Sequence, residues 1–166
     1  MRSEDVGING TILPNDFNKL SQKLQWLEEI REAEKIAMGM AKSKSEVPRT
    51  IPKIAIISPP CTHKSLSGSV VEGSSIDLTV RFISDTQPHR AIPLTRALCT
   101  AVAAKIKGSI VEQCLSSIVL SLIQTRLLSV SGRIQVNATT DSNNEAECAT
   151  VFKTARRIFE GRVSRK

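Results

Sequence analysis

The sequence predicts an α+β fold in which several strands wrap around one central, apolar helix. Residues 75–84 alternate apolar and polar side chains with the period of two that a strand requires. Residues 133–139 and 146–153 alternate in the same way around the polar turn TDSNNE, which indicates a hairpin. Residues 93–106 instead show the spacing of a strongly apolar helix. Several strands with one apolar helix are typical of an α+β domain.

The composition is that of a globular protein and argues against several other classes. The 166 residues suffice for one domain with a real core but not for two ordinary domains, and 40% of them are hydrophobic. No apolar run reaches the roughly 18 residues of a membrane span. The opening MRSEDVGING lacks the apolar stretch of a secretory signal, so we expect a cytoplasmic protein. Aromatic residues, at 3%, are too few for RNA-stacking platforms.

The net charge of +7 is concentrated at the C-terminus. Residues 1–50 hold eight basic and eight acidic residues and balance to zero. Residues 151–166 hold six basic residues against Glu160, so five of the seven net charges lie there. A nucleic-acid-binding protein would carry a basic stripe over its fold together with a recognisable motif. The distribution therefore favours a solvated basic terminus over a nucleic-acid partner.

The four cysteines follow neither a metal-binding nor a disulfide pattern. Cys61, Cys99, Cys114 and Cys148 include no CxxC pair and no zinc-type cluster with histidine, so no metal is expected. We expect reduced thiols, with Cys99 and Cys148 buried as small hydrophobic side chains. Cys61 lies two residues before His63, but a nucleophilic cysteine needs a base in spatial contact, which spacing alone does not establish.

The N-terminal segment, residues 1–50, is predicted to form one long amphipathic helix over about 14–38 and a polar loop over 41–50. Asn15 or Asp16 would cap the helix, and Gly39 suits its end. The apolar positions at helical spacing are Leu20, Leu24, Leu27, Ile30 and Ile36.

The central part of the chain reads as strand, loop, strand and helix. Residues 52–58 form an apolar strand that Pro59 and Pro60 end, and residues 61–74 form a Ser- and Gly-rich loop. In strand 75–84, one face carries apolar residues and the other carries Asp77, Thr79 and Arg81. The helix 93–106 is expected to be buried nearly all round, since small Ala and Thr residues cover much of its remaining surface. Its apolar face comprises Leu94, Leu98, Ala101, Val102 and Ile106.

The C-terminal part is less regular. Residues 109–137 read as strands, although the apolar segment 114–130 fits helix or strand. The terminal ARRIFEGRV fits a strand or a helical turn.

Basic and polar side chains gather before and at the start of helix 93–106. Arg81, His89 and Arg90 precede it, and Thr95 offers a hydroxyl beside backbone N–H groups that have no intrahelical acceptor. Two guanidinium groups, an imidazole and a helix N-terminus suit a di- or tricarboxylic acid. Alternatively, Arg81 is a surface charge, His89 a loop residue and Thr95 a cap. Patterns for dinucleotide binding, phosphoryl transfer, metalloproteolysis and serine hydrolysis are absent.

An ordered series of segments resembles the PrpF family of isomerases. The series covers about residues 7–164, and its specificity lies in the order because each motif alone is weak. The sequence of these segments looks fungal in origin. The segments are IPKIAIISPP at 51–60, DLTVRFIS at 77–84, PHRAIPLTRALCTAVAAKIKGSIVEQC at 88–114, SGRIQVNAT at 131–139 and ATVFKTARRIFEGRV at 149–163, with Gly10-Thr11, Leu13-Pro14 and Met38-Gly39 before them.

The resemblance implies an isomerase without cofactor or metal that acts on unsaturated di- or tricarboxylic acids of the aconitate or methylaconitate type. It implies a fold like diaminopimelate epimerase, in which two lobes close over the substrate. Each lobe is a curved, mostly antiparallel sheet around a central helix, here 93–106. In such an enzyme a base removes a proton beside a carboxylate and a conjugate acid returns one elsewhere on the allylic system, giving cis–trans isomers or tautomers. Helix N-termini stabilise the charge that develops.

By this resemblance the chain corresponds to the second lobe, formed by residues 51–166 and ending in a basic strand, with the first lobe missing. The family's catalytic lysine and cysteine lie in the first lobe, so no catalytic residue is assigned here. Arg96 stands where the family often has a small residue, and Ser129 where it often has a histidine. The residues matched to substrate binding are Ser84, His89, Arg90, Thr95 and Arg96.

Two classes of function therefore remain open. One is an isomerase whose site is completed by a complementary first lobe or by a second copy of the chain in a homodimer. The other is a non-catalytic lobe, that is, a pseudoenzyme, a regulatory subunit or the product of a truncated gene. An in-frame first lobe that carries the lysine and cysteine would favour the enzyme.

Overall fold

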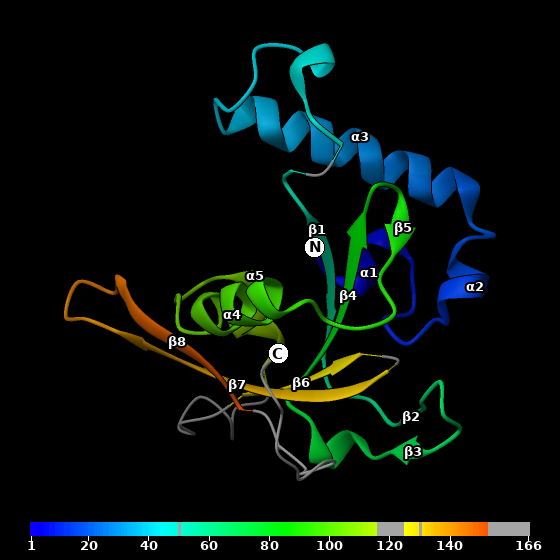
Figure 1. Cartoon of the computed structure of the whole chain (residues 1–166), viewed down its shortest axis with the longest axis vertical. Coiled ribbons are helices and arrows are strands. Elements are labelled where there is room, and N and C mark those ends of the chain that lie inside the picture. The colour runs from blue at the N-terminus through cyan, green and yellow to red at the C-terminus, as the bar shows by residue number, and fades with distance from the viewer. Residues whose placement is uncertain (50, 116–124, 130, 153–166) are drawn as a thin grey trace, which may run out of the picture.

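A curved sheet with helices at both of its ends dominates the computed structural model, which describes residues 1–49, 51–115, 125–129 and 131–152 (Figure 1). In these residues a sheet of six strands follows the order β1-β4-β6-β7-β8, with β5 paired to β4. The pairing of β4 with β6 is parallel, and the other pairings of this sheet are antiparallel. This arrangement confirms the predicted α+β class and the mostly antiparallel sheet.

The strands agree with the sequence patterns in most places. The hairpin of β7 and β8 is confirmed, as are the strands predicted near 52–58 and 75–84, each two or three residues shorter than expected. Residues 61–74, predicted as a loop, contain the small β2–β3 sheet. The strands are β1 Ile54–Ser58, β2 His63–Lys64, β3 Val70–Val71, β4 Leu78–Ser84, β5 Gln87–Pro88, β6 Thr125–Ser129, β7 Gly132–Thr140 and β8 Ala146–Phe152.

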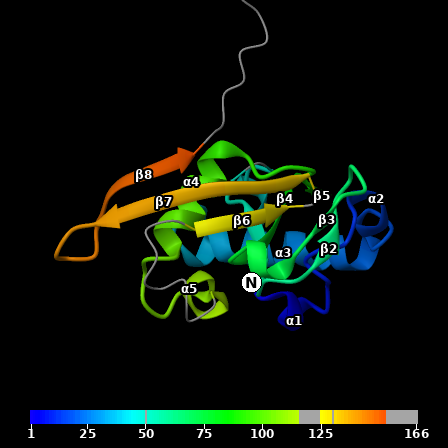
Figure 2. The same ribbon diagram turned by 90° about the horizontal axis from the view of Figure 1, so that it is seen from below.

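The helices gather in two groups (Figure 2). Helices α1–α3 lie beside β4 and β5, whereas α4 and α5 lie toward β7 and β8. No helix among the described residues is long and apolar enough to cross a membrane. The α-helices are α1 Ser3–Val6, α2 Pro14–Phe17, α3 Ser21–Ala37, α4 Leu94–Ala103 and α5 Ile110–Cys114, and single 3₁₀ turns lie at Lys44–Glu46 and Gly73–Ser75.

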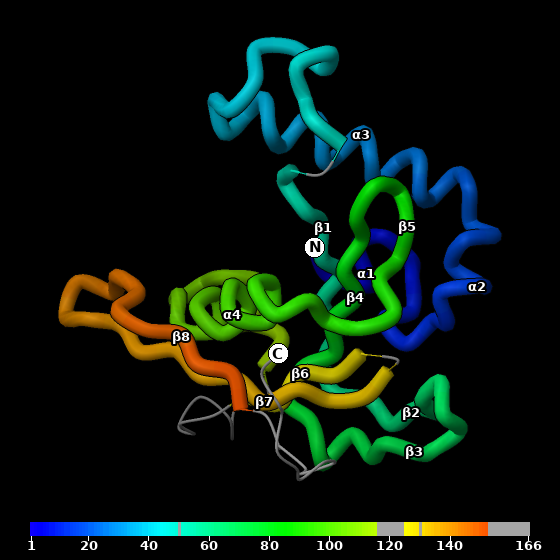
Figure 3. The backbone as a smooth tube through the Cα atoms, viewed as in Figure 1, coloured from blue at the N-terminus to red at the C-terminus, as the bar shows by residue number. Residues whose placement is uncertain are grey.

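The prediction of one helix over 14–38 is wrong, because the chain turns between α2 and α3 (Figure 3). Leu20 has the non-helical angles φ −87° and ψ 59°. The turn allows each helix to bury its own apolar residue, Phe17 from α2 at 0% exposed and Leu27 from α3 at 1%. The continuous apolar spacing in the sequence hides this break. The end of the helix was predicted correctly, since Gly39 adopts φ +71° just beyond α3.

Helix α4 packs on one face of the sheet but is not buried all round. Ala97, Thr100 and Ala101 are buried against the sheet, where their small side chains permit close approach. Leu94 is 44% exposed and Cys99 is exposed, which contradicts the predicted all-round burial. The helix also ends at Ala103, and Ile106 beyond it is 47% exposed. The physical reason is that the sheet curves around only one side of the helix in the described residues.

The segment after α4 departs further from the sequence prediction. Residues 110–114, predicted within a run of strands, form α5. Its start has a side-chain cap, since the Ser109 Oγ accepts a hydrogen bond of 3.0 Å from the Glu112 backbone N–H. Ser-x-x-Glu is a recognisable capping pattern that the strand prediction overlooked. The second cysteine predicted to be buried, Cys148, is exposed on β8. The terminal ARRIFEGRV and the basic cluster at 153–166 lie outside the described residues.

Both faces of β4 are covered, so Leu78 to Ile83 are all buried. Its even-numbered residues contact the core that includes α4 and the β7 strand. On the other face, Ile83 belongs to a second core with β1, α1, α2 and α3. A strand buried on both faces has little room for charge, yet its odd-numbered positions include Asp77, just before it, and Arg81.

The guanidinium of Arg81 is 1% exposed and binds backbone carbonyls instead of a carboxylate. Its Nη2 donates to the carbonyl of Ile12 at 2.6 Å and to that of Gly10 at 3.4 Å. Its Nη1 donates to the carbonyl of His89 at 3.2 Å. Burial lowers the pKa of Arg81 to about 10, so it stays charged at neutral pH. Arg81 is therefore not a surface charge but a tie between the N-terminal loop and the segment before α4.

Asp77 provides the corresponding tie between β4 and β6. Its carboxylate, in a residue 0% exposed, accepts from Arg126 Nη2 at 2.6 Å, from Nε at 3.0 Å and from the Arg126 backbone N–H at 2.6 Å. The registered parallel pairs of β4 with β6 are few, Leu78 with Leu127 and Thr79 with Leu128. The ion pair between Asp77 and Arg126 therefore adds to the few backbone pairs that join β4 to β6.

We expect Asp77→Asn to lower the free energy of unfolding by about 1.5–3 kcal/mol, because it removes charge-assisted hydrogen bonds from a buried site. Urea denaturation followed by circular dichroism measures this loss. The matched control is Asp16→Asn, whose ion pair with Lys19 spans 2.7 Å but is solvent-exposed and should cost less than about 1 kcal/mol. Equal losses in the two variants would contradict the role given to Asp77.

Candidate functional site

The strand registers bring three polar side chains to the face of the sheet that α4 covers. Paired residues on neighbouring strands point to the same face, and Ala55 pairs with Phe82. Two residues along the strands, Lys53 and Ser84 therefore share this face. The His89 backbone N–H donates to the Phe82 carbonyl at 2.8 Å, which continues the β4–β5 pairing and places His89 there too.

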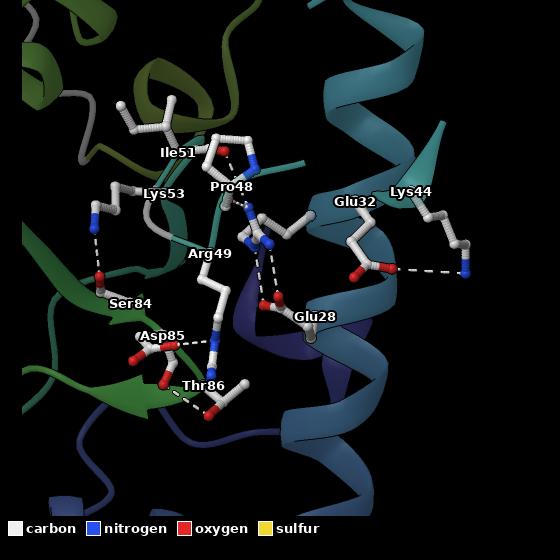
Figure 4. Close-up of polar contacts among 11 residues, drawn as sticks. Glu28, Glu32, Lys44, Pro48, Arg49, Ile51, Lys53, Ser84, Asp85 and Thr86 are labelled. Carbon is white, nitrogen blue, oxygen red and sulfur yellow. Dashed lines mark hydrogen bonds and ion pairs between the residues drawn. The ribbon is translucent and has the colours of Figure 1, made fainter. Parts of the chain in front are cut away.

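Lys53 is the residue that the sequence analysis missed. It lies half-buried just before β1, and its Nζ donates a hydrogen bond to the Ser84 Oγ (Figure 4). Burial, followed by the positive charges of Arg96 and Arg31, lowers the pKa of Lys53. A lysine directly before the apolar run IAII was the available signal, but a lone lysine at a strand start is usually a solvated end of the strand.

Arg96 reaches from the first turn of α4 back to the sheet. Its guanidinium carbon lies 5.5 Å from the centre of the Phe82 ring, a cation–π contact that holds the group over the strand. Its Nη1 is buried and has no hydrogen-bond acceptor. Burial lowers the pKa of Arg96, as expected for a cation without an acidic partner.

His89 completes a cluster with Lys53 and Arg96, which we call the cationic cluster. The His89 Nε2 is buried and has no hydrogen-bond partner. Burial, followed by the positive charges of Arg96 and Lys53, lowers the pKa of His89 below its usual value of 6.5. The imidazole is therefore mainly neutral at neutral pH, with one nitrogen available to donate.

The remaining predicted residues occupy different positions. Thr95 is exposed in the first turn of α4, where Pro93 is the N-cap and provides no side-chain cap. Arg90 is exposed, and its carbonyl accepts a hydrogen bond from the Ser131 Oγ. Arg81, predicted to join the anion site, points to the opposite face of β4 and contacts the His89 segment only through its carbonyl. Ser129 donates to the Gly132 carbonyl at 3.2 Å within the β6–β7 turn.

Lys53 and Arg96 form no ion pair in the part of the chain that the structure describes. Asp85 attracts Lys53 electrostatically, but burial and the positive charges of Arg96 and Arg31 outweigh it and lower the pKa of Lys53. Asp85, adjacent to Ser84, instead pairs with Arg49 at 2.6 Å (Figure 4). The described residues also contain no group of three or more His, Cys, Asp or Glu side chains that could hold a metal. Unpaired donors beside a helix N-terminus are suited to binding an anion.

Comparison with known proteins extends over the whole chain. The 3-methylitaconate isomerase of Eubacterium barkeri is 32% identical over 167 aligned positions, which cover 98% of this chain and 43% of that protein. The 2-methyl-aconitate isomerase of Shewanella oneidensis is 35% identical over 114, which cover 68% of this chain and 29% of that protein. This chain therefore spans less than half the length of these curated relatives.

The fold comparison agrees with the sequence comparison. The crystal structure of a methylitaconate-delta-isomerase superimposes with a TM-score of 0.85 and 31% identity, covering 97% of this chain and 42% of that chain. Its match confirms the resemblance that the ordered sequence segments indicated. The protein family described as "PrpF protein" matches this chain over residues 1–166. With the whole sequence matched and the fold shared, this chain belongs to the PrpF family.

Proposed function

We propose that this chain supplies the carboxylate-binding part of an isomerase that acts on an unsaturated di- or tricarboxylic acid. The observation that carries the proposal is the cationic cluster of Lys53, His89 and Arg96, in which Lys53 and Arg96 form no ion pair among the described residues and the buried His89 Nε2 and Arg96 Nη1 have no hydrogen-bond partner. The names of the relatives, which are isomerases of methylitaconate and methylaconitate, support this substrate class.

The proposed binding mode assigns one carboxylate to the start of α4. The Arg96 backbone N–H already donates to the Pro93 carbonyl at 3.1 Å, which leaves the N–H groups of Leu94 and Thr95 for a ligand, and the exposed Thr95 hydroxyl adds a donor. Another carboxylate would accept from Lys53 Nζ, with Ser84 holding the ammonium in place. Each charge-assisted hydrogen bond contributes about 1.5–3 kcal/mol. Arg90 lies at the exposed edge of this site and would assist entry of the anion.

In the proposed reaction, removal of a proton beside a carboxylate spreads negative charge onto the carboxylate oxygens. In the proposed binding mode the helix N-terminus and the ammonium of Lys53 would contact these oxygens and would stabilise the charge with little reorganisation. His89 would donate a hydrogen bond through Nε2 in its neutral form. By the family resemblance, the groups that move the proton belong to a complementary first lobe or to a second copy of the chain.

We expect cis-aconitate to shift the backbone amide resonances of residues 88–98 and of Lys53 and Ser84 in the isotope-labelled chain. One lobe leaves the ligand partly solvated, so the dissociation constant should be about 1 mM, or about −4 kcal/mol. Lys53→Gln should weaken binding roughly tenfold by removing one charge-assisted contact, whereas the control Lys64→Gln, an exposed lysine on β2, should not. Shifts confined to residues 153–166, or none at tens of millimolar, would show that the site is not there.

We expect the 166-residue chain alone to isomerise cis-aconitate far more slowly than about 1 s⁻¹, because general acid–base catalysis contributes about 10²–10⁴-fold and its groups are assigned elsewhere. Proton NMR in deuterated water measures both isomerisation and exchange. Turnover at about 1 s⁻¹ or faster would place the acid and base within this chain. Binding without turnover, even with a complementary lobe added, would favour the non-catalytic alternative.

The lowered pKa of His89 leads to a pH prediction. Above pH 6.5, the ordinary pKa of histidine, His89 is mainly neutral in both the folded and the unfolded chain. Below pH 6.5 the unfolded chain binds a proton at His89 more readily than the folded chain does. The free energy of unfolding should therefore decrease as the pH is lowered from about 7.5 to about 5.5. Urea denaturation should show a smaller fall in His89→Gln, and an equal fall would mean that His89 is solvated. Citrate should reduce the fall in the wild-type chain, because a bound anion favours the protonated imidazole.

A further inference from the structure

We propose that Arg96 makes the site selective for tricarboxylates over dicarboxylates whose two terminal carboxylates have the same spacing. This inference rests on the carboxylate site proposed above and names the residue that would set its preference. It adds to that site a third point of attachment, distinct from the α4 N-terminus and from Lys53.

The aromatic contact of Arg96 leaves its N–H groups available as donors. The guanidinium carbon lies 5.5 Å from the centre of the Phe82 ring, and such a contact does not occupy the N–H groups with an acceptor atom. Nη1 lies buried with no acceptor, and Arg96 takes part in no ion pair in the described ranges. A planar pair of N–H donors matches the two oxygens of one carboxylate.

The site then offers three separate groups of donors. The first is the α4 N-terminus with Thr95, the second is Lys53 beside Ser84, and the third is Arg96 beside His89. Two full positive charges and the positive end of a helix dipole balance a trianion better than a dianion. A tricarboxylate with one carboxylate on each of three adjacent carbons presents such a branched set of acceptors.

A purely structural role for Arg96 would not account for its buried Nη1 or for its positive charge near Lys53. An arginine that only covered Phe82 would gain the same aromatic contact with its N–H groups turned to solvent, whereas Nη1 is buried. Arg96 also places a second positive charge near half-buried Lys53, which disfavours the charged form of Lys53. A bound carboxylate would relieve this repulsion, so the arrangement is better suited to the liganded state than to the free one.

The test compares tricarballylate with glutarate, which has the same five-carbon chain and terminal carboxylates but lacks the central one. Neither ligand has a double bond, so neither can undergo the proposed allylic reaction. Amide titrations of the labelled chain should give about tenfold tighter binding of tricarballylate. Arg96→Gln should reduce this preference to about twofold, mainly by weakening tricarballylate. Lys107→Gln, which removes an exposed charge beyond the other end of α4, should change neither affinity.

The outcomes separate this inference from the proposed site. If neither ligand shifts residues 88–98 of the wild-type chain, the carboxylate site itself is wrong. If both ligands bind there but Arg96→Gln leaves their ratio unchanged, the site stands and the role of Arg96 is overturned. Tighter binding by Arg96→Gln would show that Arg96 fills the site and would also overturn it. Arg96→Lys keeps the charge without the planar donors and should give an intermediate ratio, so it carries the test if the glutamine variant does not fold.

Discussion

The buried guanidinium of Arg81 is the interaction on which the rest of this structure depends. A full positive charge inside a strand covered on both faces is costly unless it is hydrogen-bonded, and here backbone carbonyls accept from both terminal nitrogens of the guanidinium, while the buried Nε has no partner. Those carbonyls belong to Ile12 and His89, which are far apart in the sequence. The charge therefore joins the N-terminal loop, β4 and the segment before α4, and the last of these carries the candidate site. Loss of the guanidinium would leave buried acceptors unsatisfied at each of these places.

Strand β4 divides the molecule into two environments because its neighbours cover both faces. On the odd-numbered face, Asp77 and Arg81 use their charges internally, in an ion pair with Arg126 and in carbonyl contacts. On the even-numbered face, Lys53 and Arg96 form no ion pair among the described residues. The alternation of one strand thus separates charges that hold the fold together from the cluster for which we propose a ligand.

The relationship to the PrpF relatives agrees with this division of roles. The region shared with the methylitaconate-delta-isomerase structure includes the sheet and α4, and thus the elements that position the cationic cluster. The chain covers 42% of that structure. The proposal that this part binds carboxylates follows from its own unpaired donors and does not depend on the catalytic groups of a relative.

The sequence by itself determined the local structure wherever one physical signal dominated: the alternation of β4 and the β7–β8 hairpin, the glycine that ends α3, and the ordered segments that indicate the PrpF family. The family resemblance also pointed to Ser84, His89 and Arg96, and their role in binding stays a prediction. Only the tertiary structure decided that Arg81 is internal, that Cys99 and Cys148 are exposed, and that Lys53 joins the cluster. The reason is that periodicity reports which residues share a face, whereas burial and pairing depend on what the rest of the chain places against that face.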